Sequence, residues 1–264
     1  MSALQASVAL ELAPLAPAQV EPQVSFLGLV YDRVSVEKAV SLLLARQPGA
    51  PFASVVTPNA AHLARIDSDP DRYRPAYANA WLCLNDSRVV QFLARSRGIE
   101  LEAAPGSDLI AALLSDPRFD RGSAVLLVGG DKTLYEDLKA KMGLTNAAHF
   151  DAPMGLAHDK RALADTIAYI EAHPARFVLL AVGSPQQELI AETLRERGLA
   201  TGVGLCIGAA VEFLTARRRR APRWMSRGGL EWLFRLLSEP RKMWRRYLVE
   251  SPTVLRLYLR QLVK

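Results

Sequence analysis

The sequence contains only two cysteines and no long apolar run. Cys83 and Cys206 each lie in a short apolar segment, and one pair cannot supply a disulfide framework or a cysteine-ligated metal centre. No run approaches the roughly 18 consecutive apolar residues that a membrane-spanning helix needs. Half of the 264 residues are hydrophobic and 23% are charged, which is typical of a globular protein. We therefore expect a folded protein of a reducing compartment.

Sequence patterns for metal binding, for a catalytic triad and for export are also missing. The four histidines, at positions 62, 149, 158 and 173, are scattered without metal-ligand spacing. No Ser-His-Asp arrangement can be argued from the sequence. Residues 1–23 are rich in Ala, Pro and Leu, lack a basic start and carry Glu11 and Glu21. This composition indicates a flexible arm rather than a signal peptide.

Positive charge is concentrated at the C-terminal end of the chain. Residues 217–264 contain 14 Arg and Lys against 3 Glu, a net charge of +11; the other residues contain 19 basic and 24 acidic side chains, a net charge of −5. Three of the four tryptophans, Trp224, Trp232 and Trp244, lie in the same segment. Aromatic residues and leucines among the cations favour an anionic membrane surface over a nucleic acid as the partner.

Short apolar runs alternate with helix-length segments between residues 24 and 216. Most of the runs are continuous, as in strands that are covered on both faces. Strands are predicted at 25–31, 52–56, 81–84, 124–128, 147–150, 176–182 and 202–207. Helices are predicted at 35–46, 59–67, 87–97, 107–115, 131–141, 159–172, 187–196 and 209–215. This order predicts an α/β fold with a mainly parallel sheet and helices on both faces.

The basic C-terminal segment is predicted to form a helical appendage. A helix over 228–239 restarts at Pro240, and Ser251-Pro252 has the pattern of a helix N-terminus. In the last helix the basic residues Arg256, Arg260 and Lys264 form one stripe, and the leucines Leu255, Leu259 and Leu262 lie off it. A helix with a cationic face and a leucine-rich face is typical of the membrane interface.

Candidate site residues follow the predicted strands, because ligands of parallel sheets bind beyond the strands' carboxyl ends. The candidate loops are Thr57-Pro58-Asn59, Asn85-Asp86-Ser87, Gly129-Gly130, Gly183-Ser184-Pro185 and Gly208. Glycine turns before a helix let backbone N–H groups approach a phosphate. Asp86 could act as a general base or could cap the next helix. Thr57 and Asn59 could likewise contact a ligand or cap a helix.

Three further motifs suggest other functions. Gly202–Gly208 mimics a dinucleotide fingerprint, but no acidic residue follows at the distance where a ribose would be bound. Asp67-Ser68-Asp69 mimics a metal-binding DxD, although an N-cap in a turn between two helices explains it better. Arg217–Arg220 could contact nucleic-acid phosphates, but no recognised module accompanies it. A dinucleotide-dependent oxidoreductase and a basic nucleic-acid-binding protein remain as alternatives.

Several segments carry a resemblance to a known family. They are VVTPNAAHLAR (55–65), NDS (85–87), PGSDL (105–109), LLVGG (126–130), VGSPQQE (182–188) and RAPRWMSRGGLEWLFRLLSEPRKMWRRYL (220–248). In this order they resemble the WecG/TagA/CpsF family of bacterial glycosyltransferases, glycosyltransferase family 26. The resemblance implies a Rossmann-like catalytic domain, here residues 24–216, and a membrane-associating helical appendage, here residues 217–264, after the flexible arm (1–23) that the composition indicates.

The resemblance also implies a reaction and its partners. A sugar would move from a UDP-sugar to a polyprenyl-diphosphate-linked sugar, with inversion at the anomeric carbon, in exopolysaccharide or another cell-surface polysaccharide pathway. The enzyme would be cytoplasmic and peripheral on the inner face of the plasma membrane, with no metal or other cofactor and no nucleic-acid partner. The donor sugar (glucose, glucuronic acid or N-acetylmannosamine type) stays open, and so does the oligomeric state, with which a homo-oligomer is compatible.

Carried over residue by residue, the resemblance places the catalytic base on Asp86, with Thr57 beside it. It gives substrate-binding roles to Asn59 and Gln187, and the sequence adds the turns Gly129-Gly130 and Gly183-Ser184 for the leaving diphosphate. Appendage arginines that would close over the diphosphate are Arg235, Arg241 and Arg245. The chain departs from the family pattern at Ser87, Ala103, Gln186 and Glu212, which affects donor identity more than reaction type.

Overall fold

The computed structural model describes residues 22–153, 155–217, 221–222, 225, 230–244 and 252–262. For residues 231, 232, 235, 242 and 243 the backbone alone is described. The arm predicted over residues 1–23 therefore lies outside the described residues, apart from its last two.

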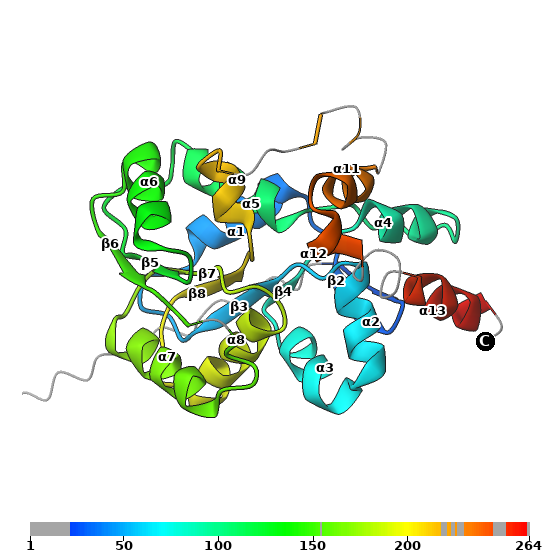
Figure 1. The fold of residues 1–264 in the computed structure, drawn as a ribbon, viewed down its shortest axis with the longest axis horizontal. Coiled ribbons are helices and arrows are strands. Elements are labelled where there is room, and N and C mark those ends of the chain that lie inside the picture. Colours follow the sequence, from blue (N-terminus) through cyan, green and yellow to red (C-terminus); the bar gives the residue numbers. More distant parts are fainter. Residues whose placement is uncertain are drawn as a thin grey trace, which may run out of the picture.

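A six-stranded sheet forms the centre of the molecule, and every neighbouring pair of its strands is parallel (Figure 1). The order across the sheet is β4 (Leu82–Cys83), β3 (Ala53–Val56), β8 (Val203–Cys206), β7 (Phe177–Leu180), β5 (Val125–Val128) and β6 (Ala147–Phe150). The central strands β3, β8, β7 and β5 are buried along their whole length. This burial explains their continuous apolar sequences and confirms the predicted parallel sheet.

Helices cover both faces of the sheet (Figure 1). One face packs against α1 (Val36–Ala45), α5 (Gly106–Ser115), α6 (Lys132–Met142) and α9 (Ala210–Leu214). The other packs against α2 (Ala60–Ser68), α3 (Pro70–Ala78), α7 (Lys160–Ala172) and α8 (Gln186–Arg197). Between β4 and α5 the chain forms α4 (Arg88–Arg95). The α/β architecture predicted from the sequence is confirmed.

The strand predicted over residues 25–31 is wrong as a single element. The structure has a hairpin of β1 (Gln23–Phe26) and β2 (Leu29–Asp32), which pair antiparallel in a separate two-stranded sheet. The connecting residues Leu27 and Gly28 both have positive φ, 50° and 85°, as a tight hairpin turn requires. The Asp32 carboxylate accepts a hydrogen bond from the Cys83 N–H at 2.8 Å, which attaches the hairpin to β4.

Three helices are described near the C-terminus: α11 (Glu231–Ser238), α12 (Pro240–Trp244) and α13 (Thr253–Leu262). The restart at Pro240 is as predicted, whereas Ser251 and Lys264 lie outside the described residues. Val254 of α13 is buried, and Tyr258 packs edge-on against Phe26 of the hairpin. Within the described residues, no helix has the length and apolar character needed to cross a membrane.

Candidate functional site

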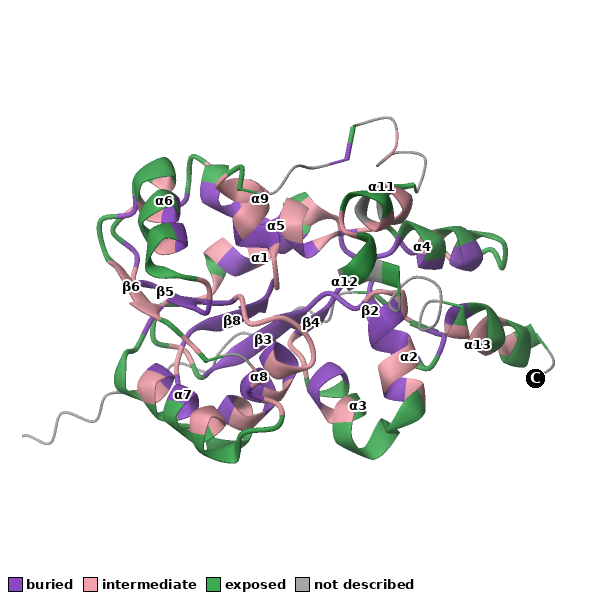
Figure 2. Cartoon of the chain, viewed as in Figure 1, coloured by how far each residue is buried: buried purple, intermediate pink, exposed green. Residues whose placement is uncertain are grey.

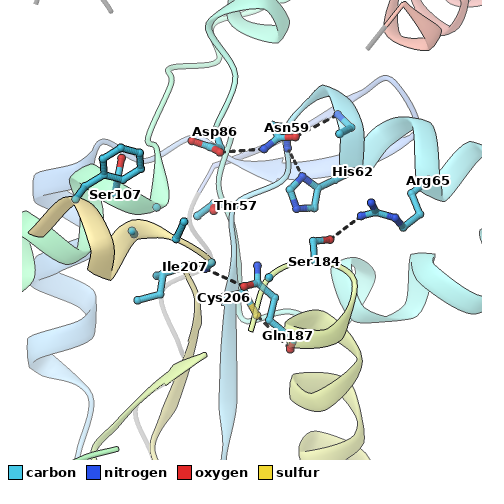
Figure 3. A pocket seen from close by; sticks show the side chains of 17 residues that line it. Thr57, Asn59, His62, Arg65, Asp86, Ser107, Ser184, Gln187, Cys206 and Ile207 are labelled. Carbon is cyan, nitrogen blue, oxygen red and sulfur yellow. Dashed lines mark hydrogen bonds between the residues drawn. The ribbon is translucent and has the colours of Figure 1, made fainter. Parts of the chain in front are cut away.

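A cavity of about 290 Å³ opens at the carboxyl edge of the sheet (Figure 3). Its walls come from the loops after β3, β4, β7 and β8 and from the N-terminal turns of α2 and α5. The cavity is lined both by candidate site residues from the sequence and by residues that the sequence did not indicate. They include Thr57, Asn59, His62, Arg65, Asp86, Gly106, Ser107, Gly183, Ser184, Gln187 and Gly208. Four loops that are far apart in the sequence therefore meet at one place, as the parallel topology requires.

The turn after β4 presents Asp86 to this cavity. The N-cap of α4 is Ser87, whose side chain accepts a hydrogen bond from the Val90 N–H at 3.2 Å. Asn85 is buried and shapes the turn: its side-chain oxygen accepts from the Ser87 N–H at 2.9 Å. The alternative in which Asp86 caps the helix is therefore wrong, and its half-buried carboxylate lines the cavity instead.

Asn59 combines the two roles that the sequence left open. Its side-chain oxygen accepts from the Ala61 N–H at 3.1 Å, which caps α2. Its side-chain amide donates to Oδ2 of Asp86, also at 3.1 Å, and so orients the carboxylate (Figure 3). The same residue therefore fixes both the start of a helix and the position of the candidate base.

Thr57 lies between Asp86 and Gln187 in the cavity wall (Figure 3). A Cβ atom built on Gly106 would lie 2.9 Å from the Thr57 hydroxyl oxygen, so glycine as the first residue of α5 lets the two segments approach this closely without displacing Thr57. The cap of α2 is Asn59, not Thr57. The Thr57 hydroxyl therefore belongs to the cavity rather than to a helix N-terminus.

A buried polar network supports the wall formed by α2 and α8. The Asn59 N–H donates to Nδ1 of His62 at 3.1 Å, so the proton of a neutral His62 is on Nε2, which lies 3.5 Å from the Glu188 carboxylate. Burial alone would raise the pKa of Glu188, but hydrogen bonds from His62 and Gln187 hold that pKa below its usual value. Glu188 is therefore an ionised acceptor inside the protein.

Gln187 lines the cavity but has both of its polar atoms engaged. Its oxygen accepts from the Gly208 N–H at 2.8 Å, and its amide donates to Glu188 at 2.7 Å. The side chain is 4% exposed. Gln187 therefore joins the loop after β8 to α8 and fixes the shape of this wall.

Arg65 is a lining residue that the sequence reasoning missed. It donates to the Ser184 hydroxyl at 2.8 Å, and it is the single Arg or Lys among the described residues that line the cavity. His62 and Arg65 are three residues apart on α2 and so share a helical face, a spacing that the sequence displays. An anionic ligand in this cavity would meet the Arg65 guanidinium.

Two long helices begin at the cavity without a side-chain cap. The N-caps of α5 and α8 are Pro105 and Pro185, and neither makes a side-chain capping hydrogen bond. By contrast, α4 is capped by Ser87 and α6 by Asp131. Helix N-termini favour negative charge through their exposed N–H groups and their dipoles. The N-terminus of α8 lies beside Arg65, which bonds Ser184, so this side of the cavity is suitable for a phosphate, and the N-terminus of α5 lies across the cavity from it.

Gly129 and Gly130 lie at the same edge of the sheet but are not among the cavity-lining residues. A Cβ on Gly129 would lie 2.8 Å from a methyl carbon of Val182, and one on Gly130 would lie 2.5 Å from a methyl carbon of Leu134. Both have positive φ, 92° and 71°. Their positive φ values favour glycine at both positions, and a role of this pair in binding the diphosphate stays a prediction, whereas Gly183 and Ser184 line the cavity.

Of the three appendage arginines predicted to bind the diphosphate, the structure describes the side chain of Arg241 alone. Arg241 is exposed on α12, the side chain of Arg235 on α11 is outside the description, and Arg245 lies outside the described residues altogether. Among the residues that the structure describes as lining the cavity, none belongs to this set of arginines.

The competing motifs have structural explanations. A Cβ on Gly202 would lie 2.0 Å from the Ala175 carbonyl oxygen, and one on Gly204 would lie 2.4 Å from the Phe52 ring, so packing requires both glycines. Asp69 caps α3, and Asp67 pairs with arginines of α13. No cluster of His, Cys, Asp or Glu suited to a metal is found within the described ranges.

A comparison with protein families agrees with the geometry of the site. The model of the family described as "Glycosyl transferase WecG/TagA/CpsF family" matches residues 24–264. The match includes every element of the sheet and all four loops that line the cavity. The chain belongs to the WecG/TagA/CpsF family of glycosyl transferases, whose members act in polysaccharide biosynthesis.

Proposed function

We propose that the protein is an inverting glycosyltransferase that moves a sugar from a UDP-sugar to a polyprenyl-diphosphate-linked sugar. The observation that carries the proposal is the Asp86 carboxylate, which lines the cavity and is oriented there by Asn59, while Ser87 is the N-cap of α4. Family membership supports sugar transfer in polysaccharide biosynthesis.

In this mechanism Asp86 removes the proton from the acceptor hydroxyl as that oxygen attacks the anomeric carbon. A new carbon–oxygen bond forms on one face of the sugar, and the bond to UDP breaks on the opposite face. The proton moves to Asp86, and the electron pair of the broken bond leaves with UDP. General-base assistance of this kind contributes about 10²–10⁴-fold to the rate.

The leaving diphosphate needs positive charge, because UDP departs as an anion. Arg65 and the uncapped N-terminus of α8 lie on one side of the cavity and the uncapped N-terminus of α5 lies on the other, and these groups would supply that charge. The appendage arginines Arg235, Arg241 and Arg245 remain part of the proposal as groups that close over the diphosphate. The reaction accordingly requires no metal or other cofactor.

The acceptor also determines where the enzyme works. A polyprenyl diphosphate is held in a membrane by its hydrocarbon chain, so the protein meets it as a peripheral protein of the cytoplasmic face. The net charge of +11 in residues 217–264 supports attachment to anionic lipids, at about 1 kcal/mol for each basic residue close to the surface. The donor is a UDP-sugar of the glucose, glucuronic acid or N-acetylmannosamine type.

The test is a panel of these UDP-sugars incubated with a short-chain sugar-diphosphate-prenol, with the products identified by mass and by anomeric configuration. One donor should give a product one sugar heavier than the acceptor and inverted at the anomeric carbon. NADH and NAD⁺ in a parallel thermal-shift measurement should not stabilise the protein, whereas UDP should. Retention of configuration in the product, or stabilisation of the protein by the nicotinamide cofactor and not by UDP, would contradict the proposal.

A further inference from the structure

Helix α4 begins at the candidate base and carries an exposed aromatic side chain. Asp86 immediately precedes the Ser87 cap, and on the helix itself Val90, Leu93 and Ala94 are buried against the core. Phe92, on the other side, is 71% exposed, the highest value among the large apolar side chains that the structure describes. Val89 is 40% exposed. Packing in the catalytic domain accounts for only one face of this helix.

The exposed face of α4 is also basic. Arg88 and Arg95 lie four residues before and three residues after Phe92, both are exposed, and these spacings place them next to Phe92. The helix Arg88–Arg95 contains no acidic residue. An apolar tip between two cations matches the boundary of an anionic bilayer, where the ring enters the acyl region and the arginines meet lipid phosphates.

Helix α13 contacts the C-terminal end of α4. The Ser96 hydroxyl at the end of α4 and the Tyr258 hydroxyl of α13 are 2.7 Å apart, which joins the two helices. The outward leucines Leu255 and Leu259 of α13 are 53% and 59% exposed. Figure 1 shows α4 and α13 at the same end of the molecule, and Figure 2 shows their outer parts as exposed. The two helices therefore present apolar side chains at one end of the molecule.

Exposed apolar side chains are strongly concentrated on α4 and in the C-terminal segment. Of the ten large ones that are exposed among the described side chains, eight lie on α4 or between residues 230 and 262. The other two are Val30 in the hairpin and Leu199. Leu199 lies between α8 and β8, at the amino edge of the sheet, and so provides a matched site away from this end.

We propose that α4 is a second membrane-contact element, with Phe92 and Val89 entering an anionic lipid surface and Arg88 and Arg95 contacting its phosphates. This inference rests on the proposed function, because the reason for it is delivery of a lipid-linked acceptor. Phe92 lies six residues after Asp86, about 9 Å along a helix axis. Contact at α4 would therefore hold the cavity close to the headgroups from which the acceptor sugar must reach Asp86.

The first experiment measures co-sedimentation of the full chain with vesicles of phosphatidylglycerol and phosphatidylcholine. Phe92→Ser should weaken association about tenfold, since one largely exposed ring is no longer buried in lipid. Leu199→Ser, which removes an equally exposed apolar side chain elsewhere, should leave association unchanged. Equal losses in both variants, or no loss in Phe92→Ser, would overturn the proposal.

A labelled variant reports insertion without relying on affinity. Cys83 and Cys206 are buried, and burial raises the pKa of both thiols, so an environment-sensitive fluorophore will react with a cysteine introduced by Phe92→Cys. Its emission should shift to the blue with anionic vesicles, whereas a label at Leu199→Cys should not respond. A blue shift that instead follows protein concentration without vesicles would identify a contact between copies of the chain and overturn the proposal.

Neither measurement uses a sugar donor or an acceptor, so failure of the proposed function and failure of this inference are distinguishable. An Asp86→Asn variant that has lost transfer should still bind vesicles like the wild type. In the active enzyme, Phe92→Ser should lose transfer to a long-chain acceptor embedded in vesicles and retain transfer to a short-chain acceptor in solution. Equal losses on both acceptors would contradict a membrane role for α4.

Discussion

The cavity and the α4–α13 end of the molecule place polar and apolar side chains in opposite ways. In the cavity wall, Asn59, His62 and Gln187 each make specific hydrogen bonds to other parts of the wall. At the α4–α13 end, Phe92 and Leu259 extend outward and are more than half exposed. We propose that the first region binds one ligand in one geometry, and that the second meets a fluid lipid surface, which needs area and charge but no fixed contacts.

This difference predicts that one substitution in the cavity causes a large loss of sugar transfer, whereas substitutions at the α4–α13 end each cause a smaller loss of vesicle association. The largest effect is expected for Asp86→Asn, which keeps the shape of the side chain and removes its basicity. Transfer should fall by about 10²–10⁴-fold, the usual contribution of a general base. Single-turnover rates measure the loss, and calorimetry should show UDP affinity within a small factor of the wild type. Near-normal turnover in this variant would contradict the assignment of the base.

The second effect concerns the outward face of α13. Replacing Leu255 and Leu259 together by Ser should weaken vesicle association about a hundredfold, since two largely exposed leucines are lost from the lipid contact. The melting temperature should stay near that of the wild type. Deletion of residues 217–264 is a poorer test of the appendage, because Val254 is buried against the core and its loss would disturb the fold as well.

The third prediction compares the effect on UDP affinity of removing an arginine in the cavity with that of removing an arginine on the surface. Arg65→Ala should weaken UDP binding about tenfold, because a charge-assisted hydrogen bond to the diphosphate is lost. Arg72→Ala is the control, since Arg72 is exposed on α3 and bonds the Ala157 carbonyl. Calorimetric titration with UDP compares the two. Equal affinities in the two variants would show that Arg65 does not contact the diphosphate.

The smallest effect concerns stability and its pH dependence. Because the pKa of Glu188 is lowered in the folded protein, ionised Glu188 stabilises the fold above the unfolded-state pKa of about 4.3, and this contribution is lost as the pH falls through the folded-state value. Glu188→Gln keeps the shape but weakens the bond from His62, and should cost about 1 kcal/mol near neutral pH. Urea unfolding measured from pH 7 down to pH 3, below the unfolded-state pKa, should show the stability gap between variant and wild type narrowing with acid; a gap that widens would contradict the ionised state.

Periodicity predicted the main fold because its strands are buried on both faces. Continuous apolar runs such as Val125–Val128 have few other interpretations when helix-length segments alternate with them. The hairpin was missed for a local reason. Its turn is Leu27-Gly28 rather than the Asn-Gly or Asp-Gly that usually marks such a turn, so the two short strands read as one.

For the site, the sequence predicted which loops meet but not how each side chain is used. Asp86 and Ser87 are adjacent and both are good N-cap residues, so only the structure shows that Ser87 caps α4. Arg65 and Glu188 were missed because each acts through a contact with a segment more than 100 residues away in the sequence. Arg65 bonds Ser184 in the loop before α8, and Glu188 pairs with His62 of α2. Gly129-Gly130 does not line the cavity, and its predicted contact with the diphosphate stays a prediction, since a tight turn and phosphate binding both favour glycine.

The most direct test of the account is a crystal structure of the protein with UDP and a sugar-diphosphate acceptor analogue. The diphosphate of UDP should lie within hydrogen-bond distance of the Arg65 guanidinium and beside the N-terminus of α8. The acceptor hydroxyl should lie within hydrogen-bond distance of the Asp86 carboxylate. Binding of UDP outside this cavity, for example against Gly129-Gly130, with Asp86 remote from the acceptor, would contradict the account.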